Sequence, residues 1–283
     1  MAVWGLSPPR RTVDRTAPEE HARMDITYPI IIAAAKSWFR LGGMTIDFEG
    51  WENIPSEGGA VMATNHNSYL DFIVSGYPGV KKKRYTRFMA KKEVFDHKVG
   101  GPLMRSFHHL AVDRANGAEA FQVAVDALKA GEIVGVYPEA TISRSFLIKD
   151  IKSGAVRMAV EAGVPIIPVA HFGMHRVQTK GHARDLSRGK TLVIRVGEPF
   201  VPEGTDVAAD TAELKRRMSD LLEECIAAYP ADQKPAGAWW VPASHGGSAP
   251  SLEEAERLDA EEKKSRAERK AAKAAAKAAA AKG

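Results

Sequence analysis

The sequence predicts an α/β fold in which helices flank a central, mainly parallel sheet, with an N-terminal amphipathic helix and a C-terminal helical tail. Two observations support this fold class. Short apolar runs typical of buried strands alternate with segments of helical periodicity between residues 60 and 230. Two of the helical segments stop at glycines, Gly131 and Gly163, as expected of helix C-caps. This strand–helix–strand rhythm is typical of parallel sheets with helices on both faces.

The central elements follow from the hydrophobic pattern, and we expect them to form one domain over residues 45–230. Apolar runs predict strands at residues 60–63, 133–137, 165–170 and 191–196, and helical periodicity predicts helices at residues 117–130, 153–162 and 210–229.

Residues 1–44 are predicted to form a loosely structured arm followed by an amphipathic membrane-association helix. Apolar side chains recur at helical spacing from residue 28 to 41, while Lys36 and Arg40 fall on another face. The helix is too short to span a bilayer, and the sequence shows neither a signal peptide nor an apolar stretch of ~20 residues. We expect it to lie in a membrane interface with Trp38 and Phe39 at headgroup level, or else to pack on the protein's own core.

Residues 231–283 are predicted to form a Pro/Gly-rich segment and a charged helical tail. Trp239 and Trp240 are aromatics in this segment that can pack on the domain or enter lipid. From residue 253 onward Ala, Glu, Lys and Arg dominate, which is typical of a solvated helix.

Composition narrows the functional classes. A chain of 283 residues with 45% hydrophobic residues can bury a large core. Its one cysteine, Cys225, excludes an internal disulfide framework and suits a reducing cytoplasm. The net charge of +5 favours anionic partners such as lipid headgroups or coenzyme phosphates. No nucleic-acid-binding motif accompanies this charge, so we expect no nucleic-acid partner.

The most informative stretch for chemistry is Asn65-His66-Asn67-Ser68-Tyr69-Leu70-Asp71, which follows the first predicted strand. A polar turn after a strand exposes side chains at one edge of a sheet. Histidine can take a proton from an alcohol, and an aspartate on its other nitrogen would fix the tautomer. His108 and Asp113 have the same spacing, but they run into a predicted strand, and we interpret His108 as structural or as a neighbour of a site.

Four blocks resemble the motifs of the glycerolipid acyltransferases, the PlsC family, in the order that the family has them. The first is the stretch from Asn65 to Asp71. The others are Phe88-Met89-Ala90-Lys91-Lys92-Glu93 with Ala111-Val112-Asp113-Arg114, then Val136-Tyr137-Pro138-Glu139-Ala140-Thr141, and finally Val164-Pro165-Ile166-Ile167-Pro168-Val169-Ala170. The resemblance covers residues 60–170 well and extends weakly to about residue 225.

The resemblance implies transfer of a fatty acyl group from a thioester to a glycerol hydroxyl, in phospholipid biosynthesis. His66 would deprotonate the acceptor hydroxyl and Asp71 would orient His66, so the alkoxide attacks the thioester without an acyl-enzyme. The implied co-substrate is acyl-CoA, with acyl carrier protein as an alternative donor, and no cofactor or metal is implied. The acceptor would be lysophosphatidate at the cytoplasmic face of an anionic membrane. Alternatives are glycerol-3-phosphate, another lysolipid, or a non-catalytic protein that binds acyl-CoA or lipid.

The resemblance also implies which residues bind the acceptor. Lys91, Lys92 and Arg114 are candidates for its phosphate, and Glu139 and Thr141 belong to the third block. Here the sequence departs from the family pattern, which is Pro-Glu-Gly-Thr-Arg-Ser. Ala140 replaces the glycine and Ile142 stands in place of the arginine, so Arg144 becomes the candidate for the missing cation, unless the acceptor headgroup differs.

Two other motifs do not predict sites. His171 and His175 have the spacing of helical metal ligands, but no Glu adjoins His171 and Gly173 lies between the pair, so we do not expect zinc there. Neither a serine-hydrolase elbow nor a dinucleotide-binding glycine pattern is present.

Overall fold

The computed structural model describes residues 27–98, 100–113 and 116–280 of the chain. In these residues seven strands form one sheet in the order β1-β7-β6-β2-β5-β3-β4. The strands are β1 Thr45–Glu49, β2 Ala60–Thr64, β3 Thr86–Lys91, β4 Leu110–Val112, β5 Ile133–Val136, β6 Ile166–Phe172 and β7 Thr191–Val196. All neighbours are parallel except β6 and β7, which are antiparallel, so the mainly parallel sheet is confirmed.

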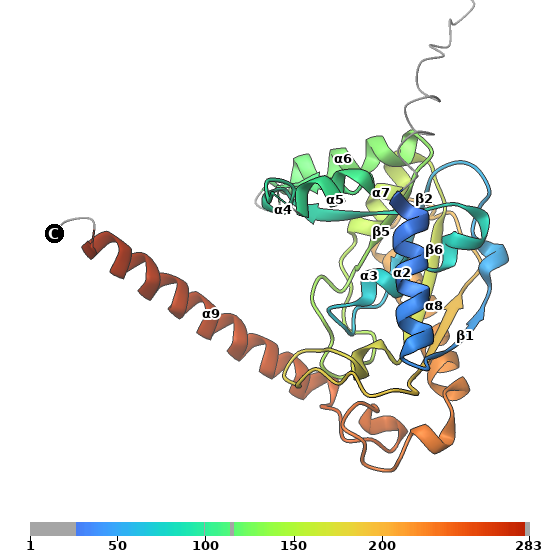
Figure 1. Cartoon of the computed structure of the whole chain (residues 1–283). Coiled ribbons are helices and arrows are strands. Elements are labelled where there is room, and N and C mark those ends of the chain that lie inside the picture. Colours follow the sequence, from blue (N-terminus) through green and yellow to red (C-terminus); the bar gives the residue numbers. More distant parts are fainter. Residues whose placement is uncertain (1–26, 99, 114–115, 281–283) are drawn as a thin grey trace, which may run out of the picture.

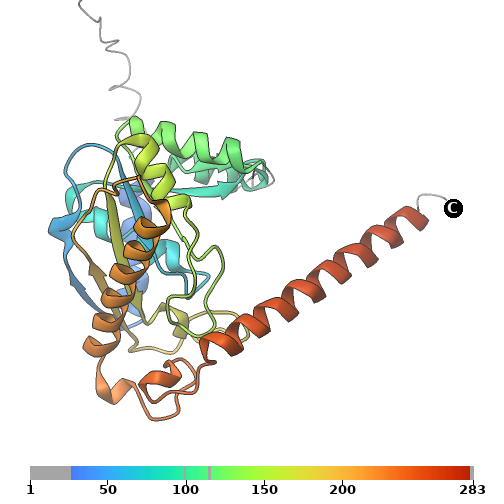
Figure 2. The same ribbon diagram turned by 180° about the vertical axis from the view of Figure 1, so that it is seen from behind.

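Helices cover both faces of this sheet (Figures 1 and 2). They are α2 Thr27–Leu41, α3 Asp71–Ser75, α4 Lys92–Phe95, α5 Gly100–Ser106, α6 Gly117–Lys129, α7 Gly154–Ala162, α8 Val207–Ala228 and α9 Leu252–Ala280. Successive residues of β2 point to opposite faces. Val61 and Ala63 pack with α6, α7 and α8, whereas Ala60 and Met62 pack in a second cluster that contains Phe39 of α2 and Val74 of α3.

The N-terminal amphipathic helix is present, and it divides its apolar side chains between the core and the surface. Phe39, which the membrane interpretation places at headgroup level, is buried in the second hydrophobic cluster with Ala60 and Met62. Ile30 and Leu41 instead face outward, 63% and 72% exposed. A sequence pattern shows that a helix is amphipathic, but it does not show which apolar side chains the core takes. No helix in the described ranges is both long enough and apolar enough to cross a bilayer.

The segment after α8 packs back on the domain. Trp240 is buried beside Tyr229 and Phe172, and the Arg176 guanidinium lies 4.3 Å from the centre of its ring. Trp239 stacks on His182 at 3.7 Å. Protein contacts therefore hold both tryptophans. Beyond its first turns α9 projects away from the domain (Figures 1 and 2).

Candidate active site

The candidate site lies at the carboxyl ends of β2, β5 and β6, which are neighbours and run parallel. Parallel strands deliver their following loops to the same edge of a sheet. His66 is the second residue after β2, and α3 begins at Asp71, so the loop between the strand and the helix is only six residues long. The strand-to-turn-to-helix context predicted from the sequence is present.

A buried carboxylate holds His66 in one orientation. Nδ1 of His66 lies 2.9 Å from Oδ2 of Asp71, a side chain with no solvent exposure. The same oxygen accepts the backbone N–H groups of Asn67 and Ser68, at 2.6 and 2.7 Å. Because a carboxylate can only accept, Nδ1 of His66 carries the proton and Nε2 keeps a lone pair. The Tyr137 ring stacks on the imidazole at 4.3 Å.

His171 completes the surroundings of Asp71. Its Nε2 lies 3.6 Å from Oδ1 of Asp71, and its ring is buried at the end of β6. Burial lowers the pKa of His171, although the Asp71 carboxylate opposes this, so the ring is neutral near pH 7. The i, i+4 spacing with His175 made this residue resemble a metal ligand, but His171 lies on a strand and only the fold brings it to Asp71. The described residues contain no group of three His, Cys, Asp or Glu side chains placed to hold a metal ion.

The loop after β5 supports the backbone of His66 from a second side. The N–H of His66 donates to Oε1 of Glu139 at 2.8 Å, and its carbonyl accepts the N–H of Ser143 at 2.7 Å. Glu139 is itself buried, and burial raises its pKa to about 8, against the N–H groups of His66 and Lys149, which lower it. Glu139 therefore holds the backbone of His66 in place.

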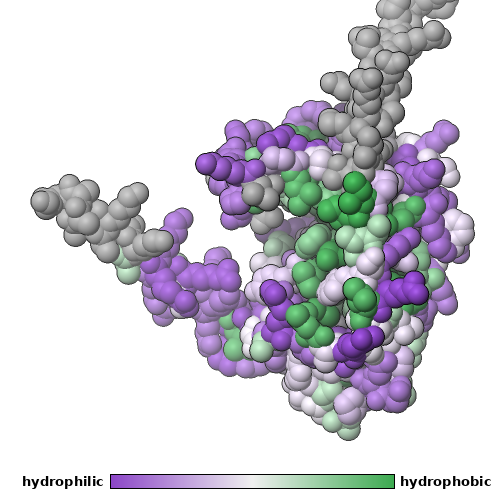
Figure 3. Space-filling model, viewed as in Figure 1, coloured by the Kyte–Doolittle hydropathy of each residue, from purple (hydrophilic) through white to green (hydrophobic). Residues whose placement is uncertain are grey.

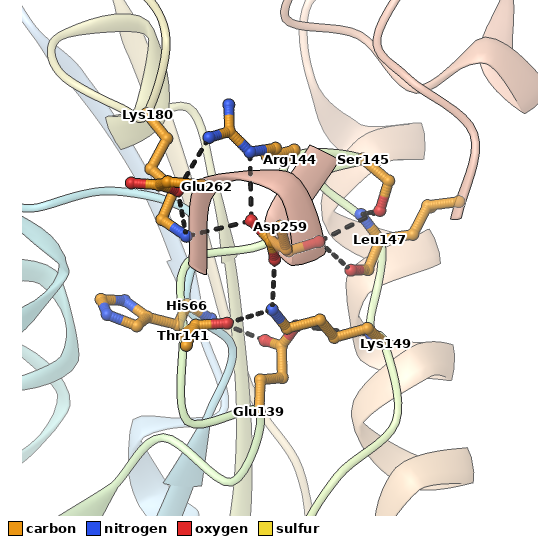
Figure 4. A network of polar contacts seen from close by, with 11 residues as sticks. His66, Glu139, Thr141, Arg144, Ser145, Leu147, Lys149, Lys180, Asp259 and Glu262 are labelled. Atoms are coloured by element: carbon orange, nitrogen blue, oxygen red, sulfur yellow. Dashed lines mark hydrogen bonds and ion pairs between the residues drawn. The ribbon is translucent and has the colours of Figure 1, made fainter. Parts of the chain in front are cut away.

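Thr141 and Arg144 lie further along this loop, together with Lys149 (Figure 4). The Lys149 ammonium donates to the Thr141 hydroxyl, and the Lys149 N–H donates to Oε2 of Glu139 at 3.3 Å. Arg144 pairs with Asp259 of α9 through Nε at 3.1 Å. The structure thus gathers Glu139, Thr141 and Arg144 near His66 and adds Lys149, which sequence reasoning missed.

The departures from the family pattern have visible consequences. Ala140 adopts a left-handed conformation with a φ of 62°, which favours glycine. Ile142 is buried, so the position where the family has arginine contributes to packing here.

The remaining candidates lie elsewhere or outside the described residues. Lys91 ends β3 and Lys92 begins α4, and both side chains are exposed. Arg114 lies outside the described residues. His108 precedes β4, and β5 and β3 separate that edge strand from β2.

Comparison with known proteins shows which family this chain resembles. A family model described as "Acyltransferase" matches residues 45–172. The 1-acyl-sn-glycerol-3-phosphate acyltransferase of Bacillus subtilis is 31% identical over 178 residues, which cover 60% of this chain and 84% of the relative. The enzyme of that name from Limnanthes douglasii is 30% identical over 172 residues, covering 59% and 58% of the two chains.

A solved structure supports the fold. The crystal structure of the 1-acyl-sn-glycerophosphate acyltransferase PlsC from Thermotoga maritima superposes with a TM-score of 0.59 at 22% identity. The superposition covers 74% of this chain and 84% of that one. With the match to the Bacillus relative and the family model, it follows that the chain belongs to the PlsC-like glycerolipid acyltransferase family.

Proposed function

We propose that the protein is a 1-acylglycerol-3-phosphate O-acyltransferase that converts lysophosphatidate and a long-chain acyl-CoA to phosphatidate and CoA. The observation that carries the proposal is the His66–Asp71 pair, in which a fully buried carboxylate fixes the Nδ1 proton of a histidine at the carboxyl edge of the sheet. The names of the bacterial and plant relatives support the choice of acceptor.

The reaction needs one base and no covalent enzyme intermediate. Nε2 of His66 takes the proton of the acceptor hydroxyl while its oxygen forms a bond to the thioester carbonyl carbon. The tetrahedral intermediate then expels the CoA thiolate, which takes the proton back from the imidazolium. Asp71 stabilises the imidazolium electrostatically between these steps. The positive net charge of the chain favours the anionic acyl-CoA as donor, and acyl carrier protein is the alternative that the assay compares.

The test is thiol release from palmitoyl-CoA, or from palmitoyl-acyl carrier protein in a parallel reaction, with lysophosphatidate, glycerol-3-phosphate or no acceptor. We expect release that requires lysophosphatidate and disappears in His66→Ala. His108→Ala is the matched control, since it removes the other histidine of the same spacing, and it should keep most of the activity.

Other outcomes would redirect the proposal. Release with glycerol-3-phosphate alone would assign the preceding acylation step. Equal losses in the two folded variants would refute the assignment of His66 as the base. No release with any acceptor would favour a binding protein, and release only from acyl carrier protein thioesters would change the donor.

We further propose that the protein attaches peripherally to the cytoplasmic face of a membrane. Ile30 and Leu41 of α2 are exposed, and so are Tyr69 and Phe72, which flank Asp71. Figure 3 shows apolar side chains gathered on the face where α2 lies. An apolar surface beside the catalytic loop would give a lysolipid direct access to His66 without leaving the interface.

Sedimentation with anionic liposomes tests the attachment. The pair Ile30→Glu/Leu41→Glu should lower the bound fraction several-fold, because it places two charges where apolar side chains would enter the interface. Val201→Glu, the same change at an exposed position between β7 and α8, is the control and should bind like the wild type. Undiminished binding of the α2 variant would contradict the proposal.

A further inference from the structure

Three cations from distant parts of the sequence meet beside the catalytic loop. Arg144 and Lys149 come from the loop after β5, and Lys180 comes from the loop between β6 and β7; we call them the basic cluster. Their side chains are only 18%, 14% and 12% exposed. Cations this close together and this sheltered repel one another unless an anion lies between them.

The anion in this structure is a pair of carboxylates from α9 (Figure 4). Asp259 accepts from Arg144 Nε at 3.1 Å, Lys180 Nζ at 3.1 Å and Lys149 Nζ at 3.3 Å. Glu262 pairs with Arg144 Nη2 at 2.9 Å and Lys180 Nζ at 3.5 Å. Asp259 and Glu262 are three residues apart on a helix, so they share one face and enter the cluster together.

The electrostatics of these carboxylates match a strongly cationic site. Partial burial would raise the pKa of Asp259, but the ammonium groups of Lys180 and Lys149 hold it below its ordinary value. Burial would likewise raise the pKa of Glu262, but the hydrogen bond from Arg144 and the charge of Lys180 outweigh it and hold this pKa below its ordinary value. Both side chains are therefore ionised at neutral pH. Together they carry two negative charges, close to the −1.5 to −2 of a phosphate monoester at pH 7.

The basic cluster is connected to the catalytic histidine on two sides. Lys149 donates its backbone N–H to Glu139, whose other carboxylate oxygen accepts the N–H of His66. Thr179, the neighbour of Lys180, donates its hydroxyl to the Asn67 carbonyl at 2.6 Å. An anion held by the cluster would consequently sit at a fixed position relative to His66, as an acceptor headgroup must.

We propose that Arg144, Lys149 and Lys180 bind the phosphate monoester of the acceptor, and that Asp259 and Glu262 of α9 occupy this site when the acceptor is absent. The inference rests on the proposed function and adds to it the regulation of acceptor binding by the tail. Since the site is open only in the fraction of molecules with α9 released, the apparent acceptor affinity is weaker than the intrinsic one by that fraction.

Acceptor kinetics test the competition. Asp259→Asn/Glu262→Gln should lower the KM for lysophosphatidate at least threefold, because the neutral amides no longer compete with the phosphate. The control Glu256→Gln/Glu268→Gln removes two exposed carboxylates from the same helix and should leave KM unchanged. Adding Lys180→Gln to the Asp259→Asn/Glu262→Gln variant should raise its KM for lysophosphatidate about tenfold or more, with a smaller effect on kcat. An unchanged KM in the neutralised tail, or an equal shift in the control, would overturn the inference.

Hydrogen exchange of α9 provides a readout that does not depend on turnover. Lysophosphatidate in detergent micelles, and inorganic phosphate at higher concentration, should increase exchange in residues 252–266, whereas lysophosphatidylcholine, whose phosphate is a diester, should not. An equal increase with phosphatidylglycerol vesicles that contain no acceptor would contradict the inference and assign the release of α9 to the membrane surface.

The two assays also separate this inference from the proposed function. Turnover with no change in α9 would overturn the inference and leave the proposed function standing. Increased exchange of α9 with lysophosphatidate but without turnover would overturn the proposed function and leave the binding of the phosphate by the basic cluster standing.

Discussion

The loop after β2 and the loop after β5 build the two halves of the site by different means. In the first, Asp71 receives Nδ1 of His66 and two backbone N–H groups, all from residues within five positions of it. In the second, Arg144 donates to Asp259, which is 115 residues further along the chain, and Glu139 accepts the N–H of His66, which is 73 residues before it. The first half is local and built around a fully buried carboxylate, whereas the second is long-range and its ion pairs with α9 are partly exposed.

This difference suits the role that we propose for each half. A general base must keep one tautomer and one position, which a buried carboxylate with several donors provides. A site that takes up and releases a charged headgroup needs cations that can exchange partners, and partly exposed ion pairs are weak enough to allow this. The first loop follows the family motif closely, while the second departs from it at Ala140 and Ile142.

The largest effect is expected from Asp71→Asn, which removes the charge that orients the base. We expect kcat to fall by about 10³-fold or more, because an amide permits the wrong tautomer of His66 and stabilises the imidazolium less. Asp113→Asn, the equivalent change in the other His-x4-Asp pair, should alter kcat less than about twofold. Steady-state thiol release measures both. Similar kcat values for the wild type and a folded Asp71→Asn variant would show that the Asp71 carboxylate is not needed to orient His66 as the base.

A smaller effect is expected at Glu139, the connection between the two loops. Its folded-state pKa of about 8 lies above that of an ordinary Glu, so its neutral form stabilises the fold at low pH. This stability is lost as pH rises through 8. Between pH 6 and pH 9 the wild type should lose about 2 kcal/mol of unfolding free energy relative to Glu139→Gln, which does not titrate. Urea unfolding at the two pH values measures the difference, and parallel pH profiles would exclude a neutral Glu139.

The smallest effect is expected from Ala140→Gly, which restores the residue of the family motif. A left-handed alanine costs roughly 1–2 kcal/mol, and the added freedom of glycine in the unfolded chain offsets part of the gain. We therefore expect a net stabilisation of about 0.5–1 kcal/mol in urea unfolding. Ala118→Gly, at an exposed position in α6, should destabilise. Destabilisation by both changes would mean that the second loop is not strained at Ala140.

Much of the fold could be predicted because buried parallel strands are continuous apolar runs. Residues 191–196 and 60–63 were assigned this way, and β7 and β2 match them within one residue. The apolar pattern does not reveal strands β1 and β3. The first has a partly exposed, charge-interrupted sequence, Thr-Ile-Asp-Phe-Glu, and the second, Thr-Arg-Phe-Met-Ala-Lys, contains two cations and a threonine. Short edge or half-exposed strands carry too few apolar residues to stand out.

The site was predictable only where its partners are close in sequence. His66 and Asp71 were found because a five-residue separation brings them together across one turn. Lys149, Lys180 and His171 were missed as site neighbours, since only the tertiary fold places them there. The tail was interpreted as solvated because its composition is that of a surface helix, and composition does not reveal that Asp259 and Glu262 have cationic partners. The one usable signal was the extra arginine, Arg144, just after the altered block.

The pairing of β2 with β5 has a consequence for how such an enzyme can diversify. The ladder that joins Ala63 to Val136 sets the spacing between the loop with the proposed base and the loop with the proposed headgroup site. We therefore expect the loop after β2 to tolerate replacement of side chains in residues 140–148 while Glu139 is retained, because it keeps its own backbone contacts to Asp71. On the proposed assignment, headgroup preference becomes a replaceable property, and chimeras that graft this segment should change the preferred acceptor.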